Sequence, residues 1–406
     1  MLKRNMITNK LKWSYRSLSS IASSKTIESI ESSLIKSKVV VKNDWTKEEI
    51  QAIYDLPFME LVHRAASVHR TYFDPSEVQR CTLLSIKTGG CVEDCKYCSQ
   101  SSRHKTAVKA TPTLKITEVL ERASKAKEAG STRFCMGAAW RDVGEMKDRK
   151  AFASVLEMVK GVRELGMEVC CTLGMLTADQ AKQLKEAGLT AYNHNLDTSR
   201  EFYPEIVTTR TYDERLKTLA NVRAAGINVC SGGILGLGEK ENDRVGLLYT
   251  LATLESHPES VPINALVQVS GTPLGNNGKE NELGASPPTA TEMTRMIATA
   301  RIVMPKTIVR LSAGRMSYSM SEQALMFMAG ANSIFYGEQL LTTPNPQVEM
   351  DNQLFKALGL KGKEPFAPIG KNMTERKVPD INLNYDNMIM DSMTVRIDHS
   401  RKKASM

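Results

Sequence analysis

The sequence predicts an α/β protein: a (β/α)8 barrel of the TIM type with an N-terminal helical cap and a C-terminal extension. Two observations lead to this prediction. A signal that ends a helix recurs along the chain, and a short apolar run typical of a buried strand follows each signal. Strands that alternate with helices form parallel sheets, and eight such units favour a closed barrel. An open, doubly wound sheet is the alternative.

The helix-ending signals share a glycine that follows the last turn. Glycine at this position can adopt the left-handed conformation, and four of the five signals also carry a cation that complements the helix dipole. The five glycines are Gly130, Gly166, Gly188, Gly226 and Gly330. We expect strands after them, at residues 133–136, 169–173, 191–196, 227–230 and 333–336, and three more at 82–87, 263–269 and 307–311. Helices are expected at 114–129, 148–165, 211–225 and 291–303.

Composition divides the chain into four segments. Residues 1–27 are rich in serine and basic residues and contain no acidic residue, which is typical of a cleaved mitochondrial transit peptide; a disordered basic tail is the alternative. Residues 44–75 predict an N-terminal helical cap, because Thr46 and Glu49 match a capping box. The barrel is expected over residues 76–360. Residues 361–406 show little periodicity and predict a flexible basic tail.

Charge and cysteine content narrow the class of protein. The net charge is +9, but residues 1–27 hold six of the cations, which leaves about +3 for the rest and argues against a nucleic-acid partner. No stretch of eighteen uncharged apolar residues predicts a membrane span. Eight cysteines are too few for a disulfide scaffold, and a mitochondrial matrix keeps thiols reduced. Metal ligation is therefore the first hypothesis for any cysteines that cluster.

Three cysteines lie close together just after the first expected strand. Cys91, Cys95 and Cys98 follow a Gly-Gly turn and fall at the C-terminal mouth, where barrels of this type carry out chemistry. Three thiols at this spacing can bind three corners of a [4Fe–4S] cluster and leave one iron open. A structural zinc site is the alternative, but it needs four ligands and only His104 is near.

Three more cysteines fall on separate expected strands. Cys135, Cys170 and Cys230 belong to the second, third and fifth strands. A single strand cysteine is usually an inert buried side chain, but three that point inward would converge and suggest a second iron–sulfur site. Cys170 and Cys171 are neighbours and should face opposite sides, and spacing alone does not choose between them.

Polar residues mark the expected fourth strand. Asn193, Asn195 and Asp197 alternate and should share one face, where a polar row inside a barrel needs partners. A self-satisfied buried network is the alternative. Residues 231–238 are glycine-rich but lack the order of a dinucleotide-binding loop, so we expect close backbone approach to a ligand instead. Arg310 alone would be interpreted as an anion binder, because arginine is normally too basic to bind a metal.

These motifs resemble those of known families. Cys91–Cys98, with an aromatic residue before the last cysteine, resembles the signature of the radical S-adenosylmethionine (SAM) superfamily. Longer strings resemble biotin synthases, from about residue 45 to 360; they cover residues 133–140, 192–198, 229–233, 309–315, 330–337 and 341–346. The resemblance implies a sulfurtransferase that inserts sulfur into dethiobiotin, the last step of biotin biosynthesis.

The resemblance also implies the cofactors and the roles of individual residues. Cys91, Cys95 and Cys98 would bind a [4Fe–4S] cluster whose open iron binds SAM. The sulfur donor would be a [2Fe–2S] cluster, and the family's Cys-x-Thr-Leu-Gly string selects Cys170 for it. Asn195 and Asp197 would be catalytic residues that contact SAM and substrate. The remaining assignments are Cys135, Cys230 and Arg310 for the second cluster, Asn193 and Asn264 for dethiobiotin, and Arg215 for SAM.

The implied partners are a ferredoxin-like electron donor and the iron–sulfur assembly machinery, with a homodimer in the mitochondrial matrix. Two alternatives stay open. Another radical SAM barrel, such as a lipoyl synthase or a hydrogenase maturase, would share the first three cysteines. A zinc-stabilised basic binding protein would do no catalysis. Cys81 and Cys171 have no expected role beyond packing, and the polar loop at 275–289 has no assigned role.

Overall fold

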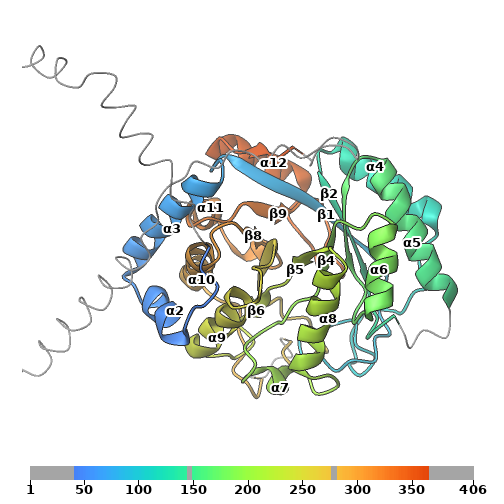
Figure 1. Cartoon of the computed structure of the whole chain (residues 1–406), viewed down its shortest axis with the longest axis horizontal. Helices are drawn as coiled ribbons and strands as arrows, with labels where there is room; N and C mark the ends of the chain where they lie inside the picture. The colour runs from blue at the N-terminus through green and yellow to red at the C-terminus, as the bar shows by residue number, and fades with distance from the viewer. Residues whose placement is uncertain (1–40, 144–148, 276–280, 365–406) are drawn as a thin grey trace, which may run out of the picture.

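The computed structural model describes residues 41–143, 149–275 and 281–364. The predicted transit peptide at 1–27 and the tail beyond 364 lie outside these residues. The strands form a parallel barrel surrounded by helices (Figure 1). The barrel strands are β1 (Glu77–Lys87), β2 (Arg133–Ala138), β3 (Glu168–Thr172), β4 (Ala191–Asn193), β5 (Asn228–Cys230), β6 (Gly233–Leu235), β7 (Ser260–Ala265), β8 (Ile308–Leu311) and β9 (Ser333–Phe335).

Pairing of the first and last strands closes the barrel. β1 pairs in parallel with both β2 and β9, and the β9 register runs from Gln79↔Ser333 to Cys81↔Phe335. The other strands follow in chain order, and β5 and β6 both pair with β7, so they share one place in the barrel. The predicted eight-position (β/α)8 barrel is therefore confirmed, with its fifth strand interrupted at residues 231–232.

A further short strand adds to the start of β1. β10 (Lys361–Gly362) pairs in parallel with Glu77 and Val78. The ordered chain thus extends past residue 360, where we expected the barrel to end. No helix within the described ranges is long and apolar enough to cross a membrane.

Helices surround the sheet, and their ends follow the sequence signals. All five predicted C′ glycines have positive φ, and capping boxes begin α2, α6, α8, α10 and α11. The helices are α2 (Lys47–Tyr54), α3 (Phe58–Tyr72), α4 (Ile116–Glu128), α5 (Arg149–Glu164), α6 (Ala178–Glu186), α7 (Tyr203–Ile206), α8 (Tyr212–Ala224), α9 (Glu241–Ala252), α10 (Ala290–Val303), α11 (Met320–Met328) and α12 (Val348–Leu358).

The two N-terminal helices pack on the outside of the barrel's helical ring. α2 contacts α9 and α10, and α3 contacts α10 (Figure 1). Trp45 donates a hydrogen bond from Nε1 to the carbonyl of Val303 over 3.1 Å, and the Ala65 and Val68 side chains are fully buried. These contacts hold the helical pair against α10 without reaching the barrel interior.

Strand alternation separates two layers of side chains. Phe134, Met136 and Cys171 belong to the large apolar core. Cys81, Cys135 and Cys170 form a distinct cluster with Ala191, against which Leu83 and Phe335 pack. Cys170 and its neighbour Cys171 therefore face opposite sides of β3, as the strand period requires.

Candidate active site

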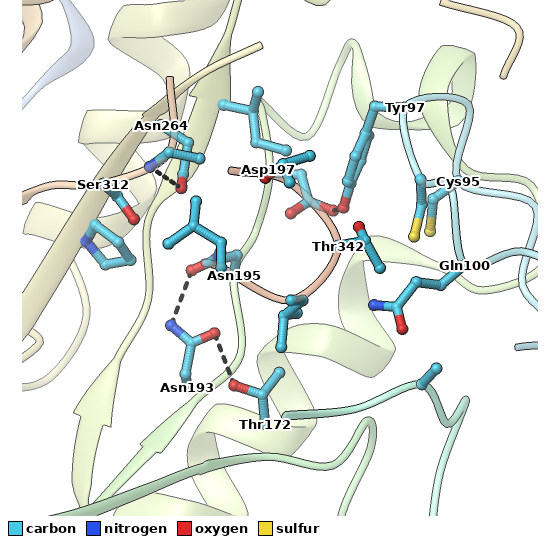
Figure 2. Close-up of a pocket in the computed structure, with 18 of the residues that line it drawn as sticks. Cys95, Tyr97, Gln100, Thr172, Asn193, Asn195, Asp197, Asn264, Ser312 and Thr342 are labelled. Atoms are coloured by element: carbon cyan, nitrogen blue, oxygen red, sulfur yellow. Dashed lines mark hydrogen bonds between the residues drawn. The ribbon is translucent and has the colours of Figure 1, made fainter. Parts of the chain in front are cut away.

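A cavity of about 330 Å³ opens at the carboxyl ends of the strands. It is lined near its mouth by Cys91, Cys95 and Cys98, and deeper in the barrel by Cys135, Cys170 and Arg310. Figure 2 shows Thr172, Asn193 and Asn195 in a row across it, with Cys95 and Tyr97 on one side and Asn264 and Ser312 on the other. One cavity thus connects both sets of predicted cysteines.

Backbone hydrogen bonds fold the three-cysteine loop back on itself. The amide of Cys91 donates to the carbonyl of Gln100 over 3.0 Å, and the amide of Cys98 donates to the carbonyl of Cys95 over 2.9 Å. Burial raises the pKa of Cys95 to about 12 and that of Cys98 to about 11, so these thiols are protonated at neutral pH and metal binding must release protons.

His104 does not complete a zinc site with these cysteines. Its Nε2 lies 3.1 Å from the carbonyl oxygen of Cys95, where it joins the backbone of the loop. Among the described residues, no three His, Cys, Asp or Glu side chains gather as the ligands of a single metal ion would. Cys91, Cys95 and Cys98 nevertheless line the same cavity, and three thiols are the protein ligands that a [4Fe–4S] cluster with one open iron would need.

Asp197 is the polar centre of the mouth. Its Oδ2 accepts hydrogen bonds from Tyr97 Oη over 2.9 Å and from Arg215 Nη2 over 2.5 Å. Asp197 is also the one non-glycine residue of the described chain with positive φ, at 67°. A strained backbone held by buried partners is typical of functional sites. The expectation that Asp197 continues the fourth strand was wrong, because β4 ends at Asn193.

The two asparagines of this segment connect the mouth to the deeper thiols. Asn193 Nδ2 donates to Asn195 Oδ1 and to the sulfur of Cys230, both over 3.3 Å. Asn195 Oδ1 also accepts from the amide of Gly232, and Arg215 donates to the Asn195 carbonyl. Asn193, Asn195 and Asp197 therefore hydrogen-bond to protein partners and also line the cavity. A buried hydrogen-bonded network and a ligand-facing polar row are thus compatible interpretations of these residues.

Asn264 lies across the cavity on β7. Its Nδ2 donates to the carbonyl of Gly233 over 2.9 Å, and its Oδ1 accepts from the amide of Ala313 over 3.2 Å. Both bonds go to backbone, so they fix the orientation of the amide against β6 and the segment that follows β8. A fixed amide that lines a cavity can read a polar ring by its donor and acceptor edges.

The deeper thiols form a closed ring of contacts with Arg310. Cys135 contacts both Cys81 and Cys170, and Cys170 contacts Cys230. Arg310 completes the ring, because its Nη1 lies 3.9 Å from the sulfur of Cys230 and its Nη2 lies 3.4 Å from that of Cys81. The three predicted strand cysteines and Arg310 thus come together, and Cys81 joins them unexpectedly.

Electrostatics in this ring favour an anionic ligand. The hydrogen bond with Cys170, aided by the charge of Arg310, lowers the pKa of Cys230 to about 6, although the thiol is buried. Arg133 is buried beside the ring and pairs with Glu168 over 2.7 Å. Its Nη1 has no hydrogen-bond partner within the described ranges. A buried guanidinium with a free donor beside several thiols fits an anionic iron–sulfur cluster.

The glycine-rich segment after β5 packs closely against the backbone of neighbouring segments. A Cβ at Gly233 would lie 2.5 Å from the carbonyl oxygen of Asp197, and one at Gly232 would overlap the carbonyl of Pro262. The close approach that we expected toward a ligand is therefore made to neighbouring backbone. These glycines let β6 pack against Asp197 and hold its unusual conformation.

Sequence reasoning missed several residues of the site. Tyr97 lies inside the cysteine motif and was identified only as an aromatic position. Neither Cys81 nor Arg133 had an assigned role in the site, although Arg133 begins the string at 133–140. Arg133 is two residues before Cys135 and hence on the same face of β2. That spacing is the signal that could have placed Arg133 beside Cys135.

The closed barrel and the three-cysteine loop at its mouth define a radical SAM enzyme. Residues 85–249 match the Radical SAM superfamily, and residues 262–361 match the Biotin and Thiamin Synthesis associated domain. The chain belongs to the biotin synthase family and hence to the sulfurtransferases. It is 61% identical over 327 residues to the biotin synthase of Schizosaccharomyces pombe, a match that covers 80% of this chain and 88% of that protein.

Other relatives and solved structures agree with this class. The mitochondrial biotin synthase of Arabidopsis thaliana is 62% identical over 80% of this chain and 83% of its own length. A crystal structure of methylornithine synthase aligns with a TM-score of 0.64 at 19% identity, over 79% of this chain and 94% of that one. A maturase of the [FeFe]-hydrogenase aligns with a TM-score of 0.66 at 17% identity, over 84% and 76%. These two structures share the fold.

Proposed function

We propose that this chain converts dethiobiotin to biotin by SAM-dependent sulfur insertion. The supporting observation is the single cavity, which reaches from the three mouth cysteines to the thiols in the barrel. When bound, a [4Fe–4S] cluster with SAM supplies an organic radical, and a [2Fe–2S] cluster supplies sulfur. The first would be held by Cys91, Cys95 and Cys98, and the second by Cys135, Cys170, Cys230 and Arg310.

The residues between the two sets of cysteines bind and orient the small molecules. Asp197 and Asn195 are the catalytic residues of the proposal, because both line the cavity midway along the hydrogen-bonded path from Tyr97 to Cys230. Carboxylate and amide oxygens at this position can accept hydrogen bonds from the ribose of SAM. Arg215 neutralises Asp197 and supports the SAM side of the site.

Dethiobiotin would lie between the polar row and Asn264. The fixed amides of Asn193 and Asn264 provide donors and acceptors for its ureido ring. Apolar side chains line the same cavity and would exclude water from a reactive carbon; they include Leu83, Ile234, Leu266, Phe335 and Leu341.

The proposal extends to partners and location. A ferredoxin-like protein would supply electrons, the iron–sulfur assembly machinery would build both clusters, and the chain would act as a homodimer. We place it in the mitochondrial matrix, because residues 1–27 have the composition of a transit peptide and two relatives are named mitochondrial biotin synthases.

A direct assay tests this proposal. The chain is purified and its clusters reconstituted without oxygen, then supplied with SAM, dethiobiotin and a reductant. We expect biotin to form while sulfide of the second cluster is lost, and Cys98→Ala to abolish both SAM cleavage and biotin formation. Cys171→Ala, which removes a thiol from the outer layer, should retain both activities. SAM cleavage without any biotin would refute the assigned substrate.

A second test uses living cells. Expression of this chain should allow a biotin-requiring cell to grow on dethiobiotin, and Cys230→Ala should not. Folded protein with both clusters that fails to support growth would contradict the proposal.

A further inference from the structure

We propose that Cys81 is a reserve ligand of the second cluster, able to replace Arg310 at the same iron. This inference rests on the proposed [2Fe–2S] site. Cys81 has the chemistry for this role, because thiolate is the usual protein ligand of iron–sulfur clusters, whereas arginine is normally protonated and binds no metal.

The position of Cys81 within the barrel supports this role. It stands on β1 in register with Arg133 of β2 and Phe335 of β9. Its side chain is fully buried and belongs to the inner cluster with Cys135 and Cys170. Cys81 is therefore a fourth thiol on the lumen side of the barrel, and its sulfur contacts Cys135 and Arg310.

The contacts of Arg310 identify which ligand Cys81 could replace. The same guanidinium donates to Cys81 through Nη2 over 3.4 Å and to Cys230 through Nη1 over 3.9 Å. Ser333 accepts a hydrogen bond from Nε over 3.1 Å, and its hydroxyl lies 3.7 Å from the sulfur of Cys81. Cys81 is thus a direct neighbour of the side chain proposed as the fourth ligand.

The free donor of Arg133 is an independent sign that an anion occupies this place. Arg133 faces the thiols of Cys81 and Cys135 from the side of β2. Its unpartnered Nη1 is buried with them. A second cationic group beside Cys81 would stabilise the additional thiolate when it binds iron.

The exchange conserves protons and needs no oxidant or reductant. With the cluster bound, the sulfur of Cys81 would take the place of the Arg310 nitrogen as the protein ligand. The thiol proton of Cys81 would pass to that nitrogen, which would become part of a guanidinium. The hydrogen-bonded contact between Arg310 and Cys81 gives this proton a direct path.

Cluster content in matched variants tests the proposal. Arg310→Ala should retain the second cluster, because Cys81 then supplies the fourth ligand, and Mössbauer spectra should change to those of two all-thiolate irons. Arg310→Ala combined with Cys81→Ala should lose that cluster. The matched control combines Arg310→Ala with Cys171→Ala, which removes an equally buried thiol on the opposite face of β3, and it should behave as Arg310→Ala alone.

Loss of the second cluster in Arg310→Ala would overturn the inference. So would retention of that cluster in the Arg310→Ala, Cys81→Ala variant with the same Mössbauer spectrum as Arg310→Ala alone. Loss of the cluster in the Arg310→Ala, Cys171→Ala control would also overturn it. Cys81→Ser in the same background preserves packing and should give the same loss as Cys81→Ala. Iron in the first cluster and the unfolding temperature report folding in every variant. A wild-type chain that binds no second cluster would instead refute the proposed function.

Discussion

The guanidinium Nη2 of Arg215 lies 2.5 Å from Oδ2 of Asp197, and both side chains are almost fully buried at the mouth of the barrel. Tyr97 donates to the same carboxylate oxygen. The pair therefore acts as one unit: Arg215 compensates the charge of Asp197, and Asp197 fixes Arg215. If Arg215 contacts SAM as predicted, its guanidinium does so while it is ion-paired with Asp197.

Asp197→Asn tests this pair. The substitution leaves the buried charge of Arg215 unpaired, so we expect a loss of about 3 kcal/mol in the free energy of unfolding. SAM cleavage should fall by about 100-fold, because the carboxylate lies in the cavity. Urea unfolding and the rate of 5′-deoxyadenosine formation measure the two effects. Arg200→Ala breaks an exposed pair with Asp213 and should change stability by less than about 1 kcal/mol. Equal effects of both substitutions would contradict this prediction.

Gly233→Ala should disturb the backbone of Asp197. The new methyl group would collide with the Asp197 carbonyl and with Leu247. We expect a loss of about 3 kcal/mol in unfolding free energy together with weaker SAM binding. Gly166→Ala is the control: its φ is also unfavourable at +80°, but no atom lies within 4 Å, so only about 1 kcal/mol should be lost and SAM binding should persist. Isothermal titration calorimetry measures SAM binding by both variants, and urea unfolding measures their stability.

Asn264→Ala should affect the substrate side of the cavity. It removes the amide that bonds to Gly233 and Ala313, and we expect KM for dethiobiotin to rise about tenfold with little change in SAM affinity. Initial rates at varied dethiobiotin concentration measure this effect. Asn242→Ala, on the exposed side of α9, should leave KM unchanged. An unchanged KM in Asn264→Ala would remove Asn264 from the substrate site.

Buried His69 on α3 should make stability depend on pH. Burial, then the charge of Arg301 on α10, lowers its pKa from 6.5 to about 3; Arg70 opposes protonation and Asp74 favours it. Below pH 6.5 the unfolded chain binds a proton that the folded chain refuses, so stability falls as pH drops toward 3. Between pH 7 and pH 5 the wild type should lose about 2 kcal/mol more than His69→Leu. Urea unfolding at pH 7 and pH 5 measures this difference. Equal losses of unfolding free energy in the wild type and in His69→Leu would contradict the prediction.

Local signals in the sequence predicted most of the fold. The glycines after each helix predicted both where the helices end and where the next strand begins, because a left-handed C′ residue is a local requirement of the backbone. The gathering of Cys135, Cys170 and Cys230 was also predictable, since inward-facing residues of a closed barrel must converge.

The features that could not be predicted from the sequence depend on contacts between segments that are far apart in the chain. Cys81 is separated from Arg310 by most of the barrel, and their contact exists only because β1 and β8 flank β9. The positive φ of Asp197 depends on Gly233 of β6, which pairs with it in an isolated parallel bridge. No local pattern around either residue reports these neighbours.

The pairing of β10 with β1 decides where the chain leaves the barrel. Lys361 is the register partner of Glu77, the first residue of β1, whereas Lys87 at the other end of that strand leads into the cysteine loop. An affinity tag, dye or solid support joined just after Gly362 would therefore start from the end opposite the entrance. An immobilised form of the protein should still admit small molecules from solution.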